Sequence, residues 1–181
     1  MPYLDALSRE AASPNNQAIF DQLKQKIGMV PNLYATYANS PVALNAILSF
    51  DGALKEGGFS NREIEAVALA IAEANSCDYC LAAHTALGKM NGFTEDETIE
   101  LRTLASQDSK LQALVALAAS ITVTRGRPEQ AALEAFFAAG YDKAALVELI
   151  GFVAVNTYNN YLNNIADTTV DFPAAPVLSA A

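Results

Sequence analysis

Helix start and stop signals recur along this chain, and they constrain its fold more than any other feature. The segments Ser60 to Glu63 and Thr94 to Glu97 have the capping-box pattern, in which a Ser or Thr is followed three residues later by Glu. Strand-like alternation of apolar and polar residues is almost absent, whereas Ala, Leu, Glu and Gln recur at helical spacing. We therefore predict an all-α fold.

The same signals predict where each helix begins and ends. Ser before Pro marks a start, and Gly or Asn after an apolar segment marks an end. We predict helices from Pro14 to about Ile27, from Pro31 through LYATYA, from Pro41 to the Gly57 and Gly58 pair, over 61–74, from Cys77 (with Ser76 as its cap) to Asn91, from Thr94 onward, and over 109–124, 128–139 and 142–167. The tail over 168–181 is rich in Pro and Ala, and we expect it to be extended.

A length of 181 residues fits a single domain. Residues 64–101 align without gaps on 112–149 with eight identical pairs, which either reflects an internal helical duplication or follows from the Ala-rich composition. The last helix is apolar nearly all round over 144–155, so we expect it to be central. Further on, Asn156, Asn160 and Asn163 share one face, where hydrogen bonds between helices are favoured over contacts with a substrate.

The charge balance excludes two classes of partner. Lys and Arg number 11 against 20 Asp and Glu, and a net charge of -9 argues against binding to nucleic acid or to an anionic membrane. The chain has no run of 18 apolar residues, and its first residues lack the basic and apolar regions of a signal peptide, so we expect a cytoplasmic protein. Only 17% of the residues are charged, which predicts that apolar surface is buried in a homo-oligomer.

The rarest residue types of the chain fall together. The two cysteines and the single histidine are Cys77, Cys80 and His84, within eight residues. A disulfide between cysteines three apart closes almost no loop, so it would add little as a structural staple. In a reducing cytosol such a pair is expected to be redox-active or to bind a metal.

Helical spacing favours redox chemistry for this cluster. Residues three or four apart are neighbours on a helix, so Cys77 and Cys80 could form a disulfide and His84 could reach the Cys80 sulfur. The helix N-terminus at Cys77 and the imidazole near Cys80 each lower a thiol pKa, and a peroxide converts a thiolate to a sulfenic acid that a neighbouring thiol resolves. Glu65, on the preceding helix, is expected to face inward and orient His84.

Residues 65–93, EAVALAIAEANSCDYCLAAHTALGKMNGF, resemble the core of the AhpD-like (alkylhydroperoxidase D) family within the carboxymuconolactone decarboxylase superfamily. The family pattern is Glu, eleven residues, Cys-x-x-Cys, three residues and His; Glu65, Cys77, Cys80 and His84 match it, and the similarity covers about 25–165. The resemblance implies a helical bundle that forms trimers or hexamers, needs no cofactor or metal, and reduces small peroxides with electrons from a lipoyl-type or other dithiol. It also implies that Cys80 forms the sulfenic acid, that Cys77 is its partner, and that Glu65 and His84 relay protons.

Several alternatives stay open at this stage. Cys77, Cys80, His84 and Glu65 could supply a zinc half-site, or the thiols could be a redox-inactive relic. A carboxymuconolactone-decarboxylase-type lyase would need an anion pocket, for which the chain offers Arg62, Arg102, Arg125 and Arg127. A third alternative is a non-catalytic helical assembly module. Alkylhydroperoxidase D has a second His where this chain has Tyr79, for which packing is favoured over proton transfer.

Overall fold

Helices connected by turns and short loops make up the described part of the chain. The computed structural model describes residues 3–178, and within them the nine helices are α1 (Pro14–Ile27), α2 (Asn32–Tyr37), α3 (Pro41–Lys55), α4 (Asn61–Ala74), α5 (Asp78–Met90), α6 (Glu95–Arg102), α7 (Ser109–Thr124), α8 (Gln130–Ala138) and α9 (Lys143–Ala166). The all-α prediction is confirmed, and the predicted helix boundaries lie within about two residues of the observed ones.

Side-chain caps explain why those boundaries could be predicted. Ser60 Oγ accepts a hydrogen bond from the Glu63 backbone N–H at 3.3 Å, and Glu63 Oε2 accepts one from the Ser60 N–H at 2.9 Å. Thr94 and Glu97 form the same reciprocal pair at the start of α6. Each cap satisfies backbone N–H groups that would otherwise lack partners in the first turn of the helix.

The predicted cap of α5 is wrong by one residue. Cys77, not Ser76, is the N-cap, and its Sγ accepts a hydrogen bond from the Cys80 backbone N–H at 3.4 Å. Ser76 has a φ of 49°, in the left-handed region, because the chain reverses there between α4 and α5. The reversal places the cysteine, rather than the serine, at the first turn of the helix.

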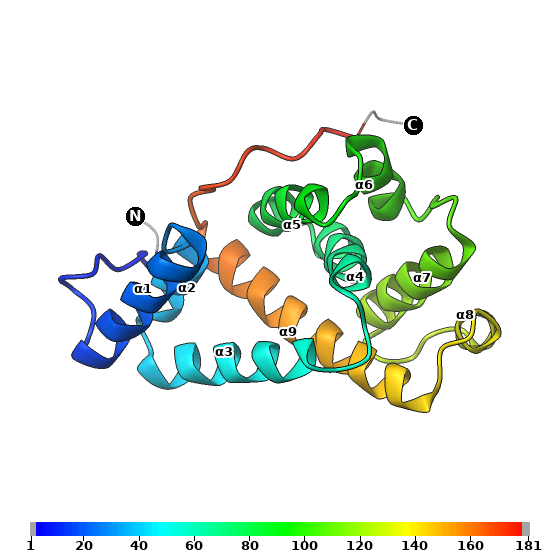
Figure 1. Cartoon of the computed structure of the whole chain (residues 1–181), viewed down its shortest axis with the longest axis horizontal. Helices are drawn as coiled ribbons and strands as arrows, with labels where there is room; N and C mark the ends of the chain where they lie inside the picture. Colours follow the sequence, from blue (N-terminus) through cyan, green and yellow to red (C-terminus); the bar gives the residue numbers. More distant parts are fainter. Residues whose placement is uncertain (1–2, 179–181) are drawn as a thin grey trace.

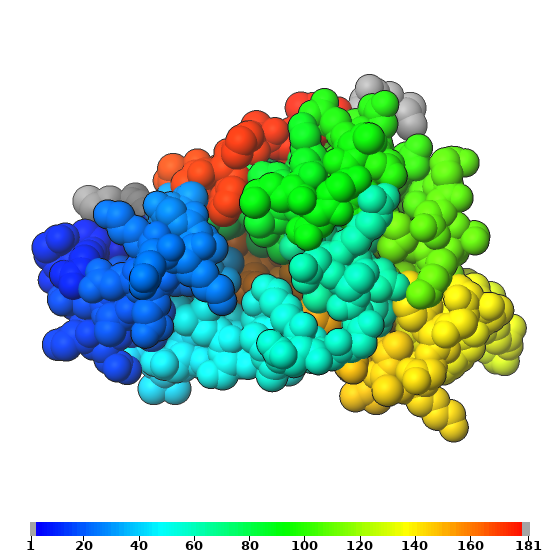
Figure 2. All heavy atoms as spheres, viewed as in Figure 1, coloured from blue at the N-terminus to red at the C-terminus, as the bar shows by residue number. Residues whose placement is uncertain are grey.

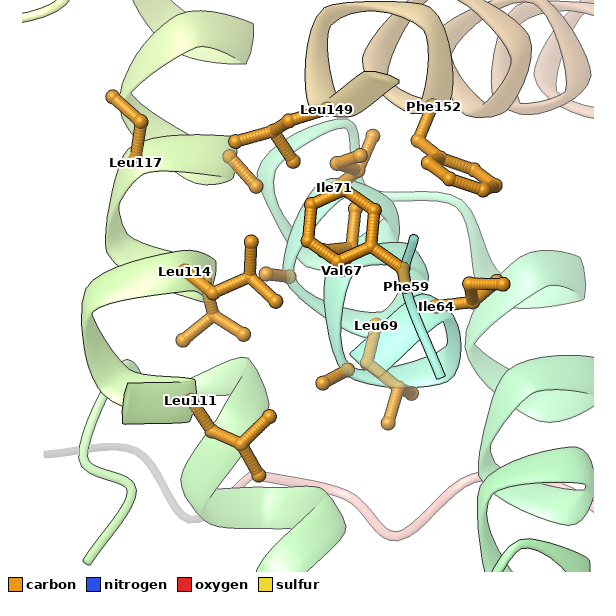
Figure 3. Close-up of a cluster of buried hydrophobic side chains, with 14 of the residues drawn as sticks. Phe59, Ile64, Val67, Leu69, Ile71, Leu111, Leu114, Leu117, Leu149 and Phe152 are labelled. Atoms are coloured by element: carbon orange, nitrogen blue, oxygen red, sulfur yellow. The ribbon is translucent and has the colours of Figure 1, made fainter. Parts of the chain in front are cut away.

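The main core forms around α4, which is buried on nearly all sides. Helix α4 packs against α5, α6, α7 and α9, and every residue from Ile64 to Ala72 is buried. Figure 3 shows Val67 and Ile71 of α4 beside Leu114 of α7 and Leu149 of α9. Complete burial of aliphatic side chains of this size is worth roughly 1.5–3 kcal/mol each. This packing holds α4 firmly at the centre of the molecule.

A second apolar cluster contains the cysteines. It combines side chains of α1, α2 and α3 with Ala72 at the end of α4, Cys77, Cys80 of α5 and Val155 of α9. The N-terminal helices therefore cover the dithiol. Figure 2 shows a hollow on one face between α2, α3, α4 and α5, with α9 at its floor.

Helix α9 crosses the molecule and is central, as its apolar sequence predicts (Figure 1). Its inner face packs against α2, α3, α4, α5 and α7. Its outer face is also apolar, with exposed side chains at helical spacing: Val147, Ile150, Tyr158, Tyr161 and Ile165. We call these five residues the α9 stripe. Among residues 3–178, no helix is both long and apolar enough to span a membrane.

Two pairs of helices begin 48 residues apart, which is the offset at which residues 64–101 align on 112–149. Helices α4 and α7 begin 48 residues apart, at 61 and 109, and α6 and α9 also begin 48 residues apart, at 95 and 143. Gly92 and Gly140, one of the identical pairs, both have a positive φ, of 91° and 93°. The duplication itself stays a prediction, and the middle pair departs from the offset, because α5 and α8 begin at 78 and 130.

The C-terminal segment after α9 forms an extended strap over α5 and α6 (Figures 1 and 2). Asp171 Oδ2 accepts a hydrogen bond from the Asn32 backbone N–H at 2.7 Å, and Phe172 packs edge-on against Tyr79. Arg102 Nη1 donates to the Pro176 carbonyl at 2.6 Å. Residues 168–178 thus run as a strap without a helix, and 179–181 lie outside the described residues.

Candidate active site

The turn between α4 and α5 places the two thiols side by side. Cys77 caps α5 and Cys80 lies in its first turn, so both sulfurs are at the N-terminal end of the helix. Both cysteines are reduced, and their exposed fractions are 0% and 2%. The helix N-terminus carries a partial positive charge, which favours a thiolate there.

Glu65 and His84 form a hydrogen-bonded pair, as the sequence predicts. His84 Nδ1 lies 2.8 Å from Glu65 Oε2. Glu65 is 8% exposed on the inner face of α4, and His84 comes from the α5 face that packs against it. A buried carboxylate is unfavourable unless it is paired, and His84 supplies the partner. The carboxylate in turn orients the imidazole.

The predicted contact between His84 and the Cys80 sulfur is not formed. Within residues 3–178, His84 has no hydrogen bond to either sulfur; its one side-chain partner there is Glu65. The positive charge of the imidazole acts instead on Cys77, whose pKa it helps to lower. A proton exchanged between His84 and a sulfur in this arrangement must therefore travel through a bridging molecule or a small rearrangement.

The two thiols have opposite pKa shifts. The pKa of Cys77 is lowered to about 7, chiefly because the Cys80 S–H donates a hydrogen bond to its sulfur, and the Cys80 backbone N–H and the Asn163 amide act in the same direction against burial. The pKa of Cys80 is raised, because its S–H is held by Cys77 and because burial disfavours a second negative charge beside the first. The pair therefore carries at most one negative charge near neutral pH, and Cys77 is the position that holds it.

The asparagine face of α9 approaches the dithiol. Asn163 Nδ2 donates a hydrogen bond to Cys80 Sγ at 3.3 Å, and Asn75 Nδ2 donates to Asn160 Oδ1 at 2.9 Å. The expected hydrogen bonds between elements are thus confirmed for these two residues. Asn156 differs, because its Nδ2 donates to the Phe152 carbonyl of its own helix. The sequence alone did not indicate that Asn163 reaches the thiols; the only signal was the helical spacing of the three asparagines.

Tyr79, between the two cysteines, is part of the packing. It is 4% exposed, its hydroxyl oxygen accepts a hydrogen bond from the Leu33 backbone N–H at 3.2 Å, and its ring meets Phe172 of the strap. Burial raises its pKa, so the hydroxyl is neutral near pH 7. Tyr79 thus joins α5 to α2 and to the C-terminal strap.

The arginines that a lyase would need do not converge. Arg62 and Arg102 are each paired with a glutamate at 2.8 Å, and Arg125 and Arg127 lie exposed in the loop after α7. Among residues 3–178, no group of three or more His, Cys, Asp and Glu side chains is arranged to hold a metal ion. The chemistry-bearing groups that do converge are the dithiol, the Glu65–His84 pair and the α9 asparagines.

Comparison with known proteins gives a family match and several structural matches. Residues 41–109, which include the Glu and the Cys-x-x-Cys-x-x-x-His cluster, match the carboxymuconolactone decarboxylase family. No curated protein matches the sequence.

The solved structures with a similar fold align over most of the chain. An uncharacterized peroxidase-related protein from Silicibacter sp. TM1040 is 24% identical, with 92% of each chain covered and a TM-score of 0.79. An uncharacterized peroxidase-related protein from Ralstonia eutropha JMP134, described as having an alkylhydroperoxidase AhpD core, is 20% identical, with a TM-score of 0.83 over 92% of this chain and 90% of that one. The debrominase Bmp8, in complex with 2,3,4-tribromopyrrole, is 16% identical, with a TM-score of 0.80 over 94% and 92%. At these sequence identities the structural matches show that the fold is shared, and they show nothing about the reaction.

Proposed function

The chain belongs to the carboxymuconolactone decarboxylase superfamily and has its AhpD-like fold, and from this premise we propose that it is a thiol-dependent peroxidase. In this proposal Cys77 and Cys80 alternate between dithiol and disulfide, and Glu65 and His84 relay protons. The observation that carries it is the reduced, buried dithiol at a helix N-terminus, with one thiol pKa near 7 and a carboxylate–imidazole pair beside it.

The first step is the attack of Cys80 on a peroxide. The Cys80 proton moves to the Cys77 thiolate along their hydrogen bond, and the Cys80 sulfur then attacks the terminal oxygen of the hydroperoxide. The O–O bond breaks, Cys80 becomes a sulfenic acid, and the departing alkoxide takes a proton from Cys77 and leaves as an alcohol. Cys77 is then again a thiolate.

The second step forms the disulfide. The Cys77 thiolate attacks the Cys80 sulfur, the S–O bond breaks, and the hydroxide takes a proton from His84 to leave as water. Glu65 stabilises His84 while the imidazole is protonated, which is the role of an orienting carboxylate in a proton relay. The anionic dithiol gives up two electrons and its one proton, His84 gives the second proton, and the peroxide becomes one alcohol and one water.

A dithiol must reduce the enzyme again. Thiol–disulfide exchange with a lipoyl-type or other small dithiol restores both thiols and leaves the donor as a disulfide. Reduced cysteines with an exchange partner of this kind are typical of a reducing compartment, so we propose that the protein works in the cytoplasm.

The partner of the α9 stripe is proposed to be a second copy of the chain. Five large apolar side chains are exposed along one face of a single helix, and an exposed apolar surface of this kind can mark a protein–protein interface. A trimer or hexamer would bury this face.

The test combines peroxide consumption with mass spectrometry. Reduced protein mixed with a limiting amount of an organic hydroperoxide should lose two hydrogens per chain, and a sulfenic-acid trap should label Cys80 in a Cys77→Ser variant. Tyr79→Phe is the matched control within the same motif and should keep the wild-type rate. Labelling of Cys77 in a Cys80→Ser variant, with no labelling of Cys80 in Cys77→Ser, would reverse the roles of the two sulfurs. No peroxide consumption, with turnover of a brominated pyrrole instead, would replace the peroxidase proposal by thiol-dependent debromination.

A further inference from the structure

The buried amide of Asn163 lies against the dithiol and buried Asn160 precedes it by one turn of α9, and we propose that the two form an amide cradle that stabilises the negative charge as it passes between the Cys77 and Cys80 sulfurs. Asn163 touches a reacting atom and is assigned as a catalytic residue, and Asn160 is its positioning neighbour. The inference deepens the proposed thiol chemistry, on which its role in turnover rests.

Asn163 is placed to serve both sulfurs. It is 3% exposed, and its Nδ2 donates to Cys80 Sγ at 3.3 Å. An amide nitrogen has two N–H bonds, so one can remain on Cys80 while the other points elsewhere. The same amide acts to lower the pKa of Cys77 as well as that of Cys80.

The orientation of Asn160 is determined by a residue outside the dithiol. Asn160 is fully buried, and its Oδ1 accepts the hydrogen bond from Asn75 Nδ2. Asn75 ends α4, and its carbonyl is held in turn by Asn164 Nδ2 at 3.0 Å. With its Oδ1 on Asn75, Asn160 directs its Nδ2 away from Asn75. Asn160 also acts to lower the pKa of the Cys80 thiol.

The cradle contains donors and acceptors that the neighbouring side chains leave unused. Among the described residues, Asn160 Nδ2 and Asn163 Oδ1 have no hydrogen-bond partner. A buried amide group without a partner is unfavourable, whereas N–H groups facing a thiolate form charge-assisted hydrogen bonds, which are stronger than neutral ones. The asparagines therefore favour the anionic form of the pair. The free Asn163 oxygen could accept the O–H of a hydroperoxide beside the same sulfur.

Other groups around the sulfurs cannot replace this role. His84, paired with Glu65, acts on Cys77 through its charge alone. The Tyr37 hydroxyl donates to Asn159 Oδ1 at 2.9 Å, and the Tyr79 hydroxyl is bound by the Leu33 backbone N–H, so neither phenol is directed at a sulfur. The Cys80 backbone N–H is fixed on Cys77 Sγ, and among the described side chains the Asn163 amide is the uncharged donor bound to the other sulfur.

The test measures thiol ionisation without any peroxide. The pH dependence of the ultraviolet absorbance of the thiolate gives the apparent pKa of the pair. In Asn163→Leu this pKa should rise by at least about one unit, which lowers the thiolate fraction at neutral pH about fivefold. Asn156→Leu is the matched control, because Asn156 is equally buried on the same face of α9 and bonds only its own helix. It should titrate like wild type.

Other results of the same titrations would overturn the amide cradle or separate it from the proposed peroxidase function. A folded Asn163→Leu variant with the wild-type titration would overturn the cradle. If that variant does not fold, Asn163→Asp keeps the shape and replaces the donor by a carboxylate, so a titration unchanged from wild type would again overturn the cradle. A wild-type protein without peroxidase activity, but with the Asn163-dependent pKa, would refute the proposed function and retain the cradle.

Discussion

Removing the Cys80 side chain should raise the pKa of Cys77, because the Cys80 S–H is the largest single cause that lowers it. With a pKa of about 7, roughly half of Cys77 is a thiolate at neutral pH, whereas a thiol at the ordinary value of 9.0 would be about 1% ionised. Cys80→Ala keeps the backbone N–H of residue 80 and the Asn163 amide, so we expect the pKa to rise to about 8 or higher. The thiolate fraction then falls to about a tenth or less.

A Cys80→Ser variant separates the hydrogen bond from the other causes, since the serine hydroxyl can still donate to the Cys77 sulfur. Thiolate absorbance across the pH range should show Cys80→Ser titrating close to wild type and Cys80→Ala titrating at higher pH. If both variants titrated near 7, the lowered pKa would come from the helix N-terminus and the backbone N–H. The reasoning from the dithiol hydrogen bond would then be refuted.

Three further results are expected. Glu65→Gln should slow peroxide reduction by about 10²–10⁴ in a stopped-flow assay while the circular dichroism spectrum stays native; an unchanged rate at every pH would mean that Glu65 has no part in the relay. Leu114→Ala, in the α4–α7 core, should lower the free energy of unfolding measured in urea by about 2–5 kcal/mol. Met90→Ala, at an exposed position, should change it by less than about 0.5 kcal/mol, and equal effects of the two substitutions would contradict the assigned core. Ile150→Glu combined with Ile165→Glu should convert the assembly to monomers in sedimentation velocity, and a monomeric wild-type protein would refute the proposed oligomer.

Local signals account for what could be predicted. A capping box joins residues three apart, such as Ser60 and Glu63, so it can be recognised without knowing the fold. The spacing of Glu65, Cys77, Cys80 and His84 likewise depends on two consecutive helices and the short turn between them. For this reason the helix boundaries and the Glu65–His84 hydrogen bond agree with the sequence-based predictions.

The contacts between residues far apart in the sequence could not be predicted, because they depend on how distant helices pack. Asn163 and Cys80 are 83 residues apart, and Asp171 and Asn32 are 139 apart, so these contacts exist only because α9 and the strap fold back over α5 and α2. The order of the two thiol pKa values follows first from the hydrogen bond between the two cysteines and then from their burial, while the α9 amides act to lower both values. The sequence by itself determined which helices form and which reactive residues they carry. Only the tertiary structure decided how deeply each sulfur is buried and which amides reach it, because those groups come from helices far away in the sequence.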